Sequence, residues 1–498
     1  IRPSLIATLM IPFYAALGIS NDVGMLANIL ALGLLLLATY SLGASIRDDR
    51  TGLIASLLVG SYPMVVGLSH IILAEMLMTA LVAATLLALW RSDRLGNTWW
   101  SLLAGLFTGL GFLSKVFFFA FVGGPWFVTI VSAARAPVGT RRHRLFQVAR
   151  LLTSAALACA LVASWYVANL EPLIERSVHV AVGTEADLYG PANPFTWGNL
   201  VSYLVSFIGI NISFAGFCLF LFSFTVLLIP GHGREDGIAA PRASHWRALV
   251  LLTSSALLAY LLFTSLHNQD QKHIIGALPA VAVLTAWGLV KVTGRKWPLA
   301  FAVVSTVMVG QTLAGTFPGP LLGKPITIRV LGRPLHLLYP AGPSPFCVKL
   351  AAPNPAAWPI REILDYSLLV SDLQSLRDHR ATIGVIPNFP GVEPATFIFE
   401  AYRLHQPADV QWAFPKNLEG TDALIHKTGD PGFAGRLPVA EELERILSEP
   451  DCPFKLMPRT FLLPTGDQVL VYARRPSPAL PGPPHVTHPA RVVFGASA

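Results

Sequence analysis

Two ionisable side chains stand at the edges of long apolar segments, where a charge is costly and therefore a candidate for function. Glu75 begins the segment Ile71–Trp90, and its carboxylate is able to hold a metal, orient a hydroxyl or accept a proton. Lys115 directly follows the segment Trp99–Leu113, and a fixed cation at that position suits a phosphate group. The alternatives are a carboxylate solvated by lipid headgroups and a lysine that snorkels to the interface.

A long polar loop adds carboxylates, an imidazole and a phenol. His179 follows Glu175 at the spacing that places both side chains on one helical face. Glu185, Asp187 and Tyr189 come next in the same loop and form a candidate substrate-binding group. A divalent metal ion or a sugar is the expected ligand, and an ordinary solvated loop is the alternative for each residue.

A second, shorter polar loop covers His267–His273. Its last two residues, Lys272 and His273, abut the following apolar segment, where they are placed to clamp a lipid-linked phosphate. A short loop that only contacts headgroups is the alternative.

The elements that position these residues are apolar segments of membrane-spanning length. A segment of about 20 apolar residues crosses the hydrocarbon core of a bilayer, and the chain is 53% hydrophobic and 13% charged. The expected segments are Ser4–Ile19, Met25–Ile46, Leu53–Leu68, Ile71–Trp90, Trp99–Leu113, Val116–Ala133, Val148–Leu170, Leu200–Ile229, Ala248–Leu266, Ile274–Val290 and Pro298–Leu313. One soluble core cannot bury so many, so the sequence predicts a polytopic membrane protein.

The basic residues predict the orientation of these segments. The net charge of +8 comes largely from Lys and Arg in alternate short loops, which is the pattern of cytoplasmic loops and not of a nucleic-acid-binding protein. The intervening loops contain Arg176 and Lys272 as their basic residues. The regions 171–199 and 267–273 and everything after Leu313 are therefore expected outside. The Arg-, Ala- and Pro-rich composition is typical of a bacterium, so we expect the inner membrane, with the last third of the chain in the periplasm.

The predicted fold class is mainly α, a transmembrane helical bundle with a small C-terminal α/β domain on the outer face. The bundle takes residues 1–315, a proline-rich linker 316–360, the α/β domain 361–476 and a disordered tail 477–498. In the small domain we expect strands at Ala381–Ile386, Val410–Phe414 and Ala423–His426, helices at Ala395–His405 and Val439–Leu447, and a hairpin of Phe461–Leu463 with Gln468–Ala473.

The sequence contains none of the common nucleotide-binding or zinc-binding motifs, including the P-loop, the Rossmann glycine pattern and H-E-x-x-H. Cytoplasmic nucleotide chemistry therefore has no support. An outward-facing enzyme without a nucleotide needs an activated donor that reaches it through the lipid phase.

Several stretches of residues 1–315 resemble the GT-C membrane glycosyltransferases, in particular the bacterial relatives of dolichyl-phosphate-mannose protein mannosyltransferases and of the lipid A aminoarabinose transferase. The run Gly105–Lys115 follows the pattern G-L-x-x-G-L-x-x-L-[ST]-K closely. His70-x-x-x-x-Glu75 stands where the family often has Arg-x-x-x-x-Asp. Trp165-Tyr166 resembles the family's Pro-Trp-Tyr, and Lys272 to Ala280 resembles its K-x-x-Y-L-L-P-x-x-P-A segment without the tyrosine.

The resemblance implies a GT-C bundle with an outward-facing catalytic cavity and inverting transfer of a sugar from a polyprenyl-phosphate donor to a hydroxyl of a lipid, glycan or protein. A mannosyltransferase-like activity is the family expectation. Lys115, Lys272 and His273 are then expected at the donor phosphate, and Glu75 and His179 near the acceptor or a divalent metal ion. The family's main catalytic Asp-Glu pair belongs to an earlier loop, so we expect an N-terminal span and loop upstream of Ile1.

Two other function classes remain open. A transporter or flippase of lipid-linked sugars is expected to show repeated halves and charges in broken helices. A non-catalytic envelope assembly protein is expected to bind a partner or glycan through its outer domain without turnover.

Overall fold

The computed structural model describes two compact units, one built around residues 1–355 and one around residues 356–498. The described residues are 5–69, 72–135, 141–182, 196–229, 242–266, 271–316, 326–330, 333–338, 359–371, 381–386, 392, 394–404, 406, 408–413, 415–428, 437–463 and 467–475. The expected sites Glu185, Asp187 and Tyr189 lie outside these residues.

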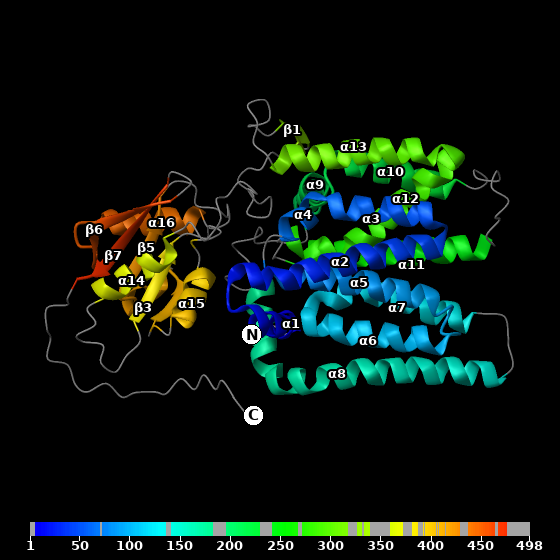
Figure 1. The fold of residues 1–498 in the computed structure, drawn as a ribbon, viewed down its shortest axis with the longest axis horizontal. Coiled ribbons are helices and arrows are strands. Elements are labelled where there is room, and N and C mark those ends of the chain that lie inside the picture. Colours follow the sequence, from blue (N-terminus) through cyan, green and yellow to red (C-terminus); the bar gives the residue numbers. More distant parts are fainter. Residues whose placement is uncertain are drawn as a thin grey trace. The chain divides into compact units, whose positions relative to one another are not determined.

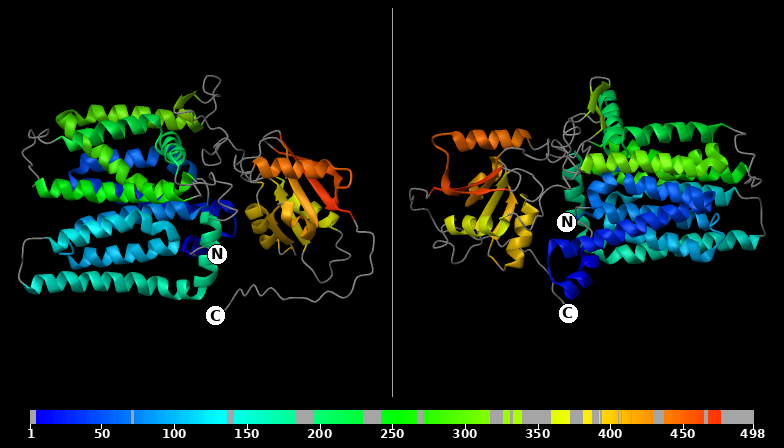
Figure 2. Two further views of the ribbon diagram at one scale, coloured as in Figure 1. Left: turned by 180° about the vertical axis from the view of Figure 1, so that it is seen from behind. Right: turned by 45° about the horizontal axis from the view of Figure 1, so that its top comes forward.

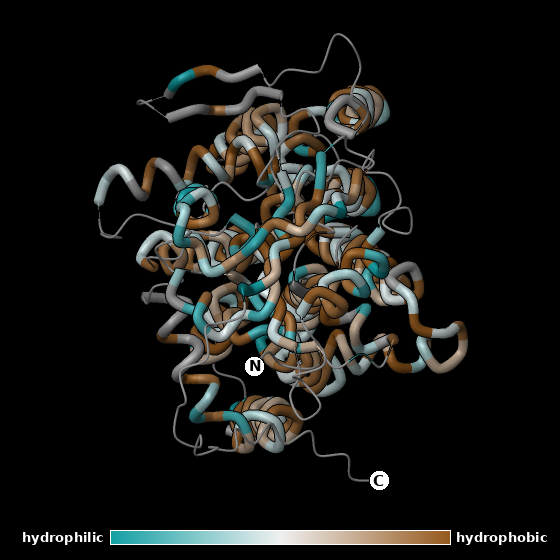
Figure 3. Tube along the Cα trace, turned by 90° about the vertical axis from the view of Figure 1, so that its left-hand side faces the viewer, coloured by the Kyte–Doolittle hydropathy of each residue, from teal (hydrophilic) through white to brown (hydrophobic). Residues whose placement is uncertain are grey.

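The first unit is a bundle of apolar helices that lie side by side (Figure 1). Its elements are α1 (Leu5–Leu17), α2 (Asn21–Ile46), α3 (Asp49–Ser61), α4 (Pro63–Ser69), α5 (Ala74–Arg91), α6 (Thr98–Ser114), η1 (Val116–Phe118), α7 (Phe119–Ala134), α8 (Arg141–Val182), α9 (Trp197–Ser206), the π-helical turn η3 (Phe207–Asn211), α10 (Phe214–Leu228), α11 (Arg242–Ser265), η5 (Gln271–Ala277), α12 (Leu278–Thr293), η6 (Gly294–Lys296) and α13 (Trp297–Thr316). Apolar residues, brown in Figure 3, run along the helices. The described residues contain six helices long and apolar enough to cross a membrane, or up to eight if each bent pair is one span.

Two of the expected continuous segments are broken. The segment Leu53–Leu68 divides into α3 and α4 at Tyr62, with a bend of 64° just before Pro63. The segment Leu200–Ile229 divides after η3, and its two helical parts are bent by 106°. Ser213 caps α10 with its side chain and has a φ of +68°, a conformation that non-glycine residues seldom adopt.

The ends of the helices form two groups. Trp90 donates its indole N–H to the carbonyl oxygen of Ser45 at 3.0 Å, and Lys291 donates to the carbonyl oxygen of Val226 at 2.9 Å. These contacts join ends that carry the basic loops, and we call this the basic end of the bundle. The opposite ends, which include α4, the start of α5, η1 and η5, form what we call the site end.

The longest helix, α8, lies at the edge of the bundle in both views of Figure 2. It packs along α6, and only 6% of the 18-residue window that marks it as a span is buried. Gly105 and Gly109 of α6 lie against the backbone of α8 at Ser154 and Ala158. A Cβ at Gly105 would collide with the Ser154 backbone, and a Cβ at Gly109 would be in tight contact with that of Ala158. Small residues of this kind allow close helix contact in a membrane.

The second unit is a five-stranded sheet between two layers of helices. Strand order is β4-β3-β5-β7-β6, with β3 parallel to β4 and β5, and β7 antiparallel to β5 and β6. The strands are β3 (Ala381–Ile386), β4 (Ala408–Trp412), β5 (Ala423–Lys427), β6 (Phe454–Leu462) and β7 (Gln468–Arg474). Helices α14 (Ile360–Val370) and α15 (Pro394–Arg403) share one core with the sheet, and α16 (Leu437–Ser448) shares the other. The expected fold class, mainly α with a small C-terminal α/β domain, is confirmed.

A hairpin of β1 (Ile326–Val330) and β2 (Arg333–Leu338) lies within the segment expected to be a linker. Leu335 of β2 is buried against Val205 and Ile208, which belong to the bent region of α9 and η3. The hairpin therefore belongs to the bundle.

Candidate functional site

Lys115 owes its position to the glycine-containing run that precedes it. The run Gly105–Ser114 forms the second half of α6, and Lys115 ends the helix with an extended backbone. Tyr166 of α8 donates its hydroxyl to the carbonyl oxygen of Phe112 at 2.9 Å, close to this end. The two glycines that contact α8 therefore have a packing role, and Lys115, which follows the run, is the residue that offers chemistry.

Glu75 meets Lys115 at the site end. Glu75 lies in the first turn of α5 and is 3% exposed. The Nζ of Lys115 donates to the Oε1 of Glu75 at 2.5 Å. The preceding residues are also joined, because the Ser114 hydroxyl donates to the carbonyl oxygen of Ala74 at 3.1 Å. Adjacent residues of α5 and α6 thus fix an ion pair that is almost shielded from solvent.

The turn η5 brings further positive charge to this pair. Lys272 and His273 are both close enough to act electrostatically on the Glu75 carboxylate. The His273 ring is buried between Phe117 and Phe263, with ring-centroid distances of 5.3 and 5.7 Å. Two lysines and one histidine therefore lie near one carboxylate, so positive charge exceeds negative charge in this cluster.

The two breaks in the helices lie beside this cluster. The turn η5 packs against α4 and η3, and Gln271 donates to the Ser206 hydroxyl at 3.4 Å. Asn211, at the end of η3, is 1% exposed, and neither polar atom of its side chain has a hydrogen-bond partner among the described residues. Sequence reasoning missed Asn211, and its one signal was a polar residue within an apolar run.

The structure brings together four of the residues that the sequence singled out, namely Glu75, Lys115, Lys272 and His273. His179 lies on the last turns of α8, beyond a kink at Asn169, and its side chain is outside the described part of the chain. Phe117 and Phe263, which hold the His273 ring, were not expected from the sequence because apolar residues are common at every segment end. Among the described residues, no group of three or more His, Cys, Asp or Glu side chains is placed to hold a metal ion.

The arrangement suits a phosphate group. Ammonium groups are good partners for phosphate oxygens, and the low polarity of a buried site strengthens that attraction. The one carboxylate of the cluster is already bonded to Lys115, so an incoming phosphate competes with Glu75 for this ammonium group.

The fold of this chain is similar to that of a protein of known structure. ArnT from Cupriavidus metallidurans, in its crystal structure with bound undecaprenyl phosphate, is 13% identical, with a TM-score of 0.54 over 94% of this chain and 87% of ArnT. The apo structure of ArnT gives 12% identity and a TM-score of 0.52 over 95% and 87% of the two chains. The chain has a GT-C glycosyltransferase fold.

The GT-C bundle also matches a family at the level of sequence. Residues 21–174 match the sequence model of the dolichyl-phosphate-mannose-protein mannosyltransferase family, and this region includes Glu75 and Lys115. The oligosaccharyltransferase AglB from Archaeoglobus fulgidus, solved with an inhibitory peptide and a dolichol-phosphate, is 13% identical, with a TM-score of 0.44 over 95% of this chain and 66% of AglB. No curated protein sequence matches the chain.

Proposed function

We propose that this protein is a membrane glycosyltransferase that moves a sugar from a polyprenyl-phosphate donor to an acceptor hydroxyl. The observation that carries the proposal is the buried Glu75–Lys115 ion pair with Lys272 and His273 beside it. The GT-C fold and the family match over residues 21–174 support the same reaction class. Undecaprenyl phosphate, the lipid bound to ArnT, is a suitable carrier for the donor sugar.

The charges of the cluster fit a single displacement with inversion at the anomeric carbon. The acceptor oxygen forms a bond to that carbon, the bond from carbon to the phosphate oxygen breaks, and the polyprenyl phosphate leaves with the electron pair. Lys115 and Lys272 neutralise the negative charge that develops on this phosphate. The acceptor proton passes to a base, for which Glu75 becomes available once Lys115 turns to the phosphate.

The site end is proposed to face the periplasm, with the basic end in the cytoplasm of a bacterial inner membrane. The distribution of Lys and Arg among the loops supports this orientation. The acceptor is a lipid, a glycan or a protein, and the mannosyl group is the family-based choice for the donor sugar. The second unit is proposed to lie in the periplasm.

A divalent metal ion at this site is a weaker proposal than the phosphate-binding role. Glu75 is a hard oxygen ligand, but Lys115, Lys272 and His273 oppose a further cation beside it. A metal at this site therefore needs carboxylates from elsewhere, and residues Glu185 and Asp187 are the candidates from the sequence.

Transport of a lipid-linked sugar is the second candidate function. The breaks between α3 and α4 and between α9 and α10 favour it, because discontinuous helices frequently form the binding sites of transporters. The charged cluster favours the transferase, because its ionisable groups lie at the end of the bundle. A transporter moves the intact donor across the membrane and releases no free carrier phosphate.

The deciding experiment compares Lys115→Ala with Lys296→Ala in membranes supplied with undecaprenyl-phosphate-linked labelled sugars. Lys296 is an exposed lysine of η6 at the basic end and serves as the control. We expect Lys115→Ala to abolish label transfer and release of undecaprenyl phosphate, and Lys296→Ala to retain both. Unchanged turnover by a folded Lys115→Ala protein overturns the phosphate role of Lys115. Movement of intact donor without release of the carrier supports the transporter.

A further inference from the structure

The turn between α5 and α6, at the basic end, has an unusual backbone. Asp93, Arg94 and Leu95 have φ values of +43°, +59° and +64° in succession. Such values are uncommon for residues with a side chain, and a run of three costs conformational energy at each step. Backbone strain of this kind is maintained only where the surroundings enforce it, and it gathers at functional places.

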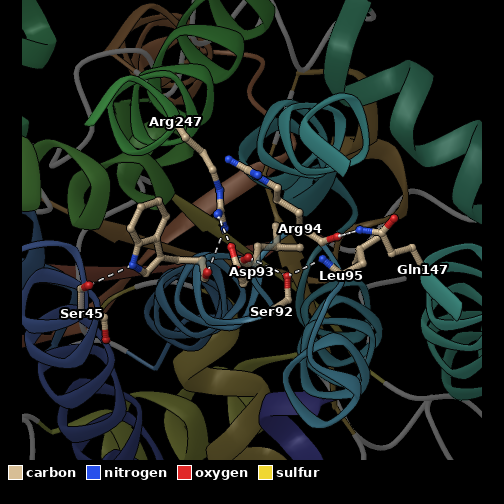
Figure 4. Close-up of polar contacts among 9 residues, drawn as sticks. Ser45, Ser92, Asp93, Arg94, Leu95, Gln147 and Arg247 are labelled. Atoms are coloured by element: carbon tan, nitrogen blue, oxygen red, sulfur yellow. Dashed lines mark hydrogen bonds and ion pairs between the residues drawn. The ribbon is translucent and has the colours of Figure 1, made fainter. Parts of the chain in front are cut away.

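Two side chains from α8, Gln147 and Arg150, hold the strained turn, and Figure 4 shows the contact of Gln147. Gln147 donates to the carbonyl oxygen of Arg94 at 2.9 Å. Arg150 donates to the carbonyl oxygens of Leu95 at 2.9 Å and Gly96 at 2.7 Å. The carbonyl groups of the turn are therefore occupied, and the Arg94 side chain is directed away from them.

Arg247 of α11 completes the arrangement from the other side. Its guanidinium donates to the Asp93 carboxylate at 2.7 Å and to the carbonyl oxygen of Trp90 at 3.0 Å, and lies 4.7 Å from the centre of the Trp90 ring. The Arg247 side chain is 11% exposed, whereas that of Asp93 is 80% exposed. Asp93 is thus the partner of Arg247 and is mostly hydrated.

Arg94 brings a second guanidinium to the same place. It is close enough to Arg247 to repel it, and Figure 4 shows both side chains reaching into one region above the turn. The Nε of Arg94 is buried, and within the described part of the chain the guanidinium makes no hydrogen bond or ion pair. Two guanidinium groups with one hydrated carboxylate leave a positive charge that an anion would neutralise.

Tryptophans place this charge at the level of lipid headgroups. Trp99 and Trp246, each next to one side of the turn, are 66% and 41% exposed. Arg91 lies over the ring of Trp100 at 4.9 Å, on the same end of α6. Exposed tryptophans are enriched at the boundary between the hydrocarbon core and the headgroups, where phosphate groups are abundant.

We propose that Arg94 and Arg247 form a phosphate-binding site at the basic end of the bundle, distinct from the Glu75–Lys115 cluster. Guanidinium groups bind phosphate oxygens through paired N–H donors. The Arg94 side chain offers such donors, and Arg247, whose terminal nitrogens already donate to Asp93 and Trp90, adds positive charge beside it. The phosphate belongs to an anionic lipid headgroup or to a soluble phosphate, and the proposal does not depend on the reaction at the other end.

The test measures thermal unfolding of the purified full chain in a zwitterionic detergent. Phosphatidylglycerol, phosphatidylcholine or inorganic phosphate is titrated into the wild type, Arg94→Gln and Arg295→Gln. Arg295→Gln removes the same charge from an exposed residue of η6 on the same end. We expect phosphatidylglycerol to raise the unfolding temperature of the wild type and of Arg295→Gln, with an apparent affinity at least about tenfold weaker for Arg94→Gln.

The ligands separate the possible sources. Stabilisation by phosphatidylglycerol alone identifies a headgroup, and equal stabilisation by inorganic phosphate identifies a soluble anion; both support the site. Without ligand, Arg94→Gln is expected to unfold at or above the wild-type temperature, because it removes a repulsion and no contact. Arg94→Lys, which keeps the charge, is expected to bind the stabilising ligand more weakly than the wild type. It replaces Arg94→Gln in the comparison if the glutamine variant is unstable. Equal ligand responses of the wild type and both Arg94 variants overturn the proposal.

Discussion

The hydroxyl of Ser114 donates to the carbonyl oxygen of Ala74, so that the last residue of α6 is bonded to the first residue of α5. The residues that follow them, Lys115 and Glu75, form the buried ion pair. The two helix ends are therefore joined twice, once by a neutral hydrogen bond and once by charge. Removing one charge leaves the other in a site that offers it little water.

The ion pair is expected to show strong coupling in a double-mutant cycle. Glu75→Gln removes the carboxylate that faces Lys115 and Lys272 and should destabilise the empty protein by about 3 kcal/mol. Lys115→Met leaves Glu75 with Lys272 and His273 as its remaining basic neighbours and should cost less. The double variant should recover part of the Glu75→Gln loss, because the Lys115 charge is no longer held in the site without its carboxylate. Thermal unfolding of the four proteins in one detergent measures the coupling. Additive losses in the double variant would mean that the two side chains do not act as a pair.

The contact between α6 and α8 predicts opposite effects for two glycines. A Cβ at Gly105 would collide with the backbone of Ser154, so Gly105→Ala should cost about 1–3 kcal/mol and lower turnover by displacing the end of α6. Gly33 of α2 has open space around its Cα, so Gly33→Ala should be neutral or stabilise by up to about 1 kcal/mol.

Unfolding temperature and sugar transfer are measured for both alanine variants. The packing role of Gly105 is refuted if its variant is as stable and as active as the Gly33 variant.

His426 predicts a pH dependence of the second unit. Burial lowers the pKa of His426 below its usual value, and the Glu444 carboxylate, 3.0 Å from its Nε2, opposes that effect only in part. The folded state thus binds the proton less readily than the unfolded state. The free energy of unfolding of the second unit therefore keeps its full value above the unfolded-state pKa of about 6.5. It decreases as the pH falls below that value, because the unfolded state takes up the proton first.

Hydrogen exchange of the β5 and α16 amides in the full chain, corrected for the intrinsic effect of pH, measures this loss between about pH 5 and 8. The His426→Gln variant, which does not titrate, should show a flat profile over the same range. A wild-type profile as flat as that of the variant would contradict the assignment.

Sequence patterns predicted the bounds of those elements whose structure depends on local hydrophobic periodicity. The strand expected at Ala381–Ile386 has the same bounds in β3, and the helix expected at Val439–Leu447 is α16 with a few more residues. The helix α14 was missed, although Ile360, Ile363 and Leu364 follow helical spacing, because the preceding prolines suggested a linker.

The candidate site shows which information the sequence lacks. The alternation of loops placed Glu75 and Lys115 at the same end of the bundle, and the structure agrees. Their direct contact depends on which helices are neighbours, and hydropathy carries no such information. The break at Tyr62 had a signal in Pro63, whereas the break at Ser213 lies within an expected apolar segment that contains no proline at that point.

Because little of α8 is buried, the positions of two proposed functional groups depend on one contact, the seam between α6 and α8 at Gly105 and Gly109. Lipid tails solvate the rest of α8 as well as protein would, so this helix gains little from burial and is retained by close contact of small residues. The same seam fixes the helix that ends at Lys115 and the helix that carries His179 on its last turns. A single bulky substitution there would misplace groups proposed for the donor and for the acceptor together, so inactivating mutations should concentrate at positions that contain no reactive atom.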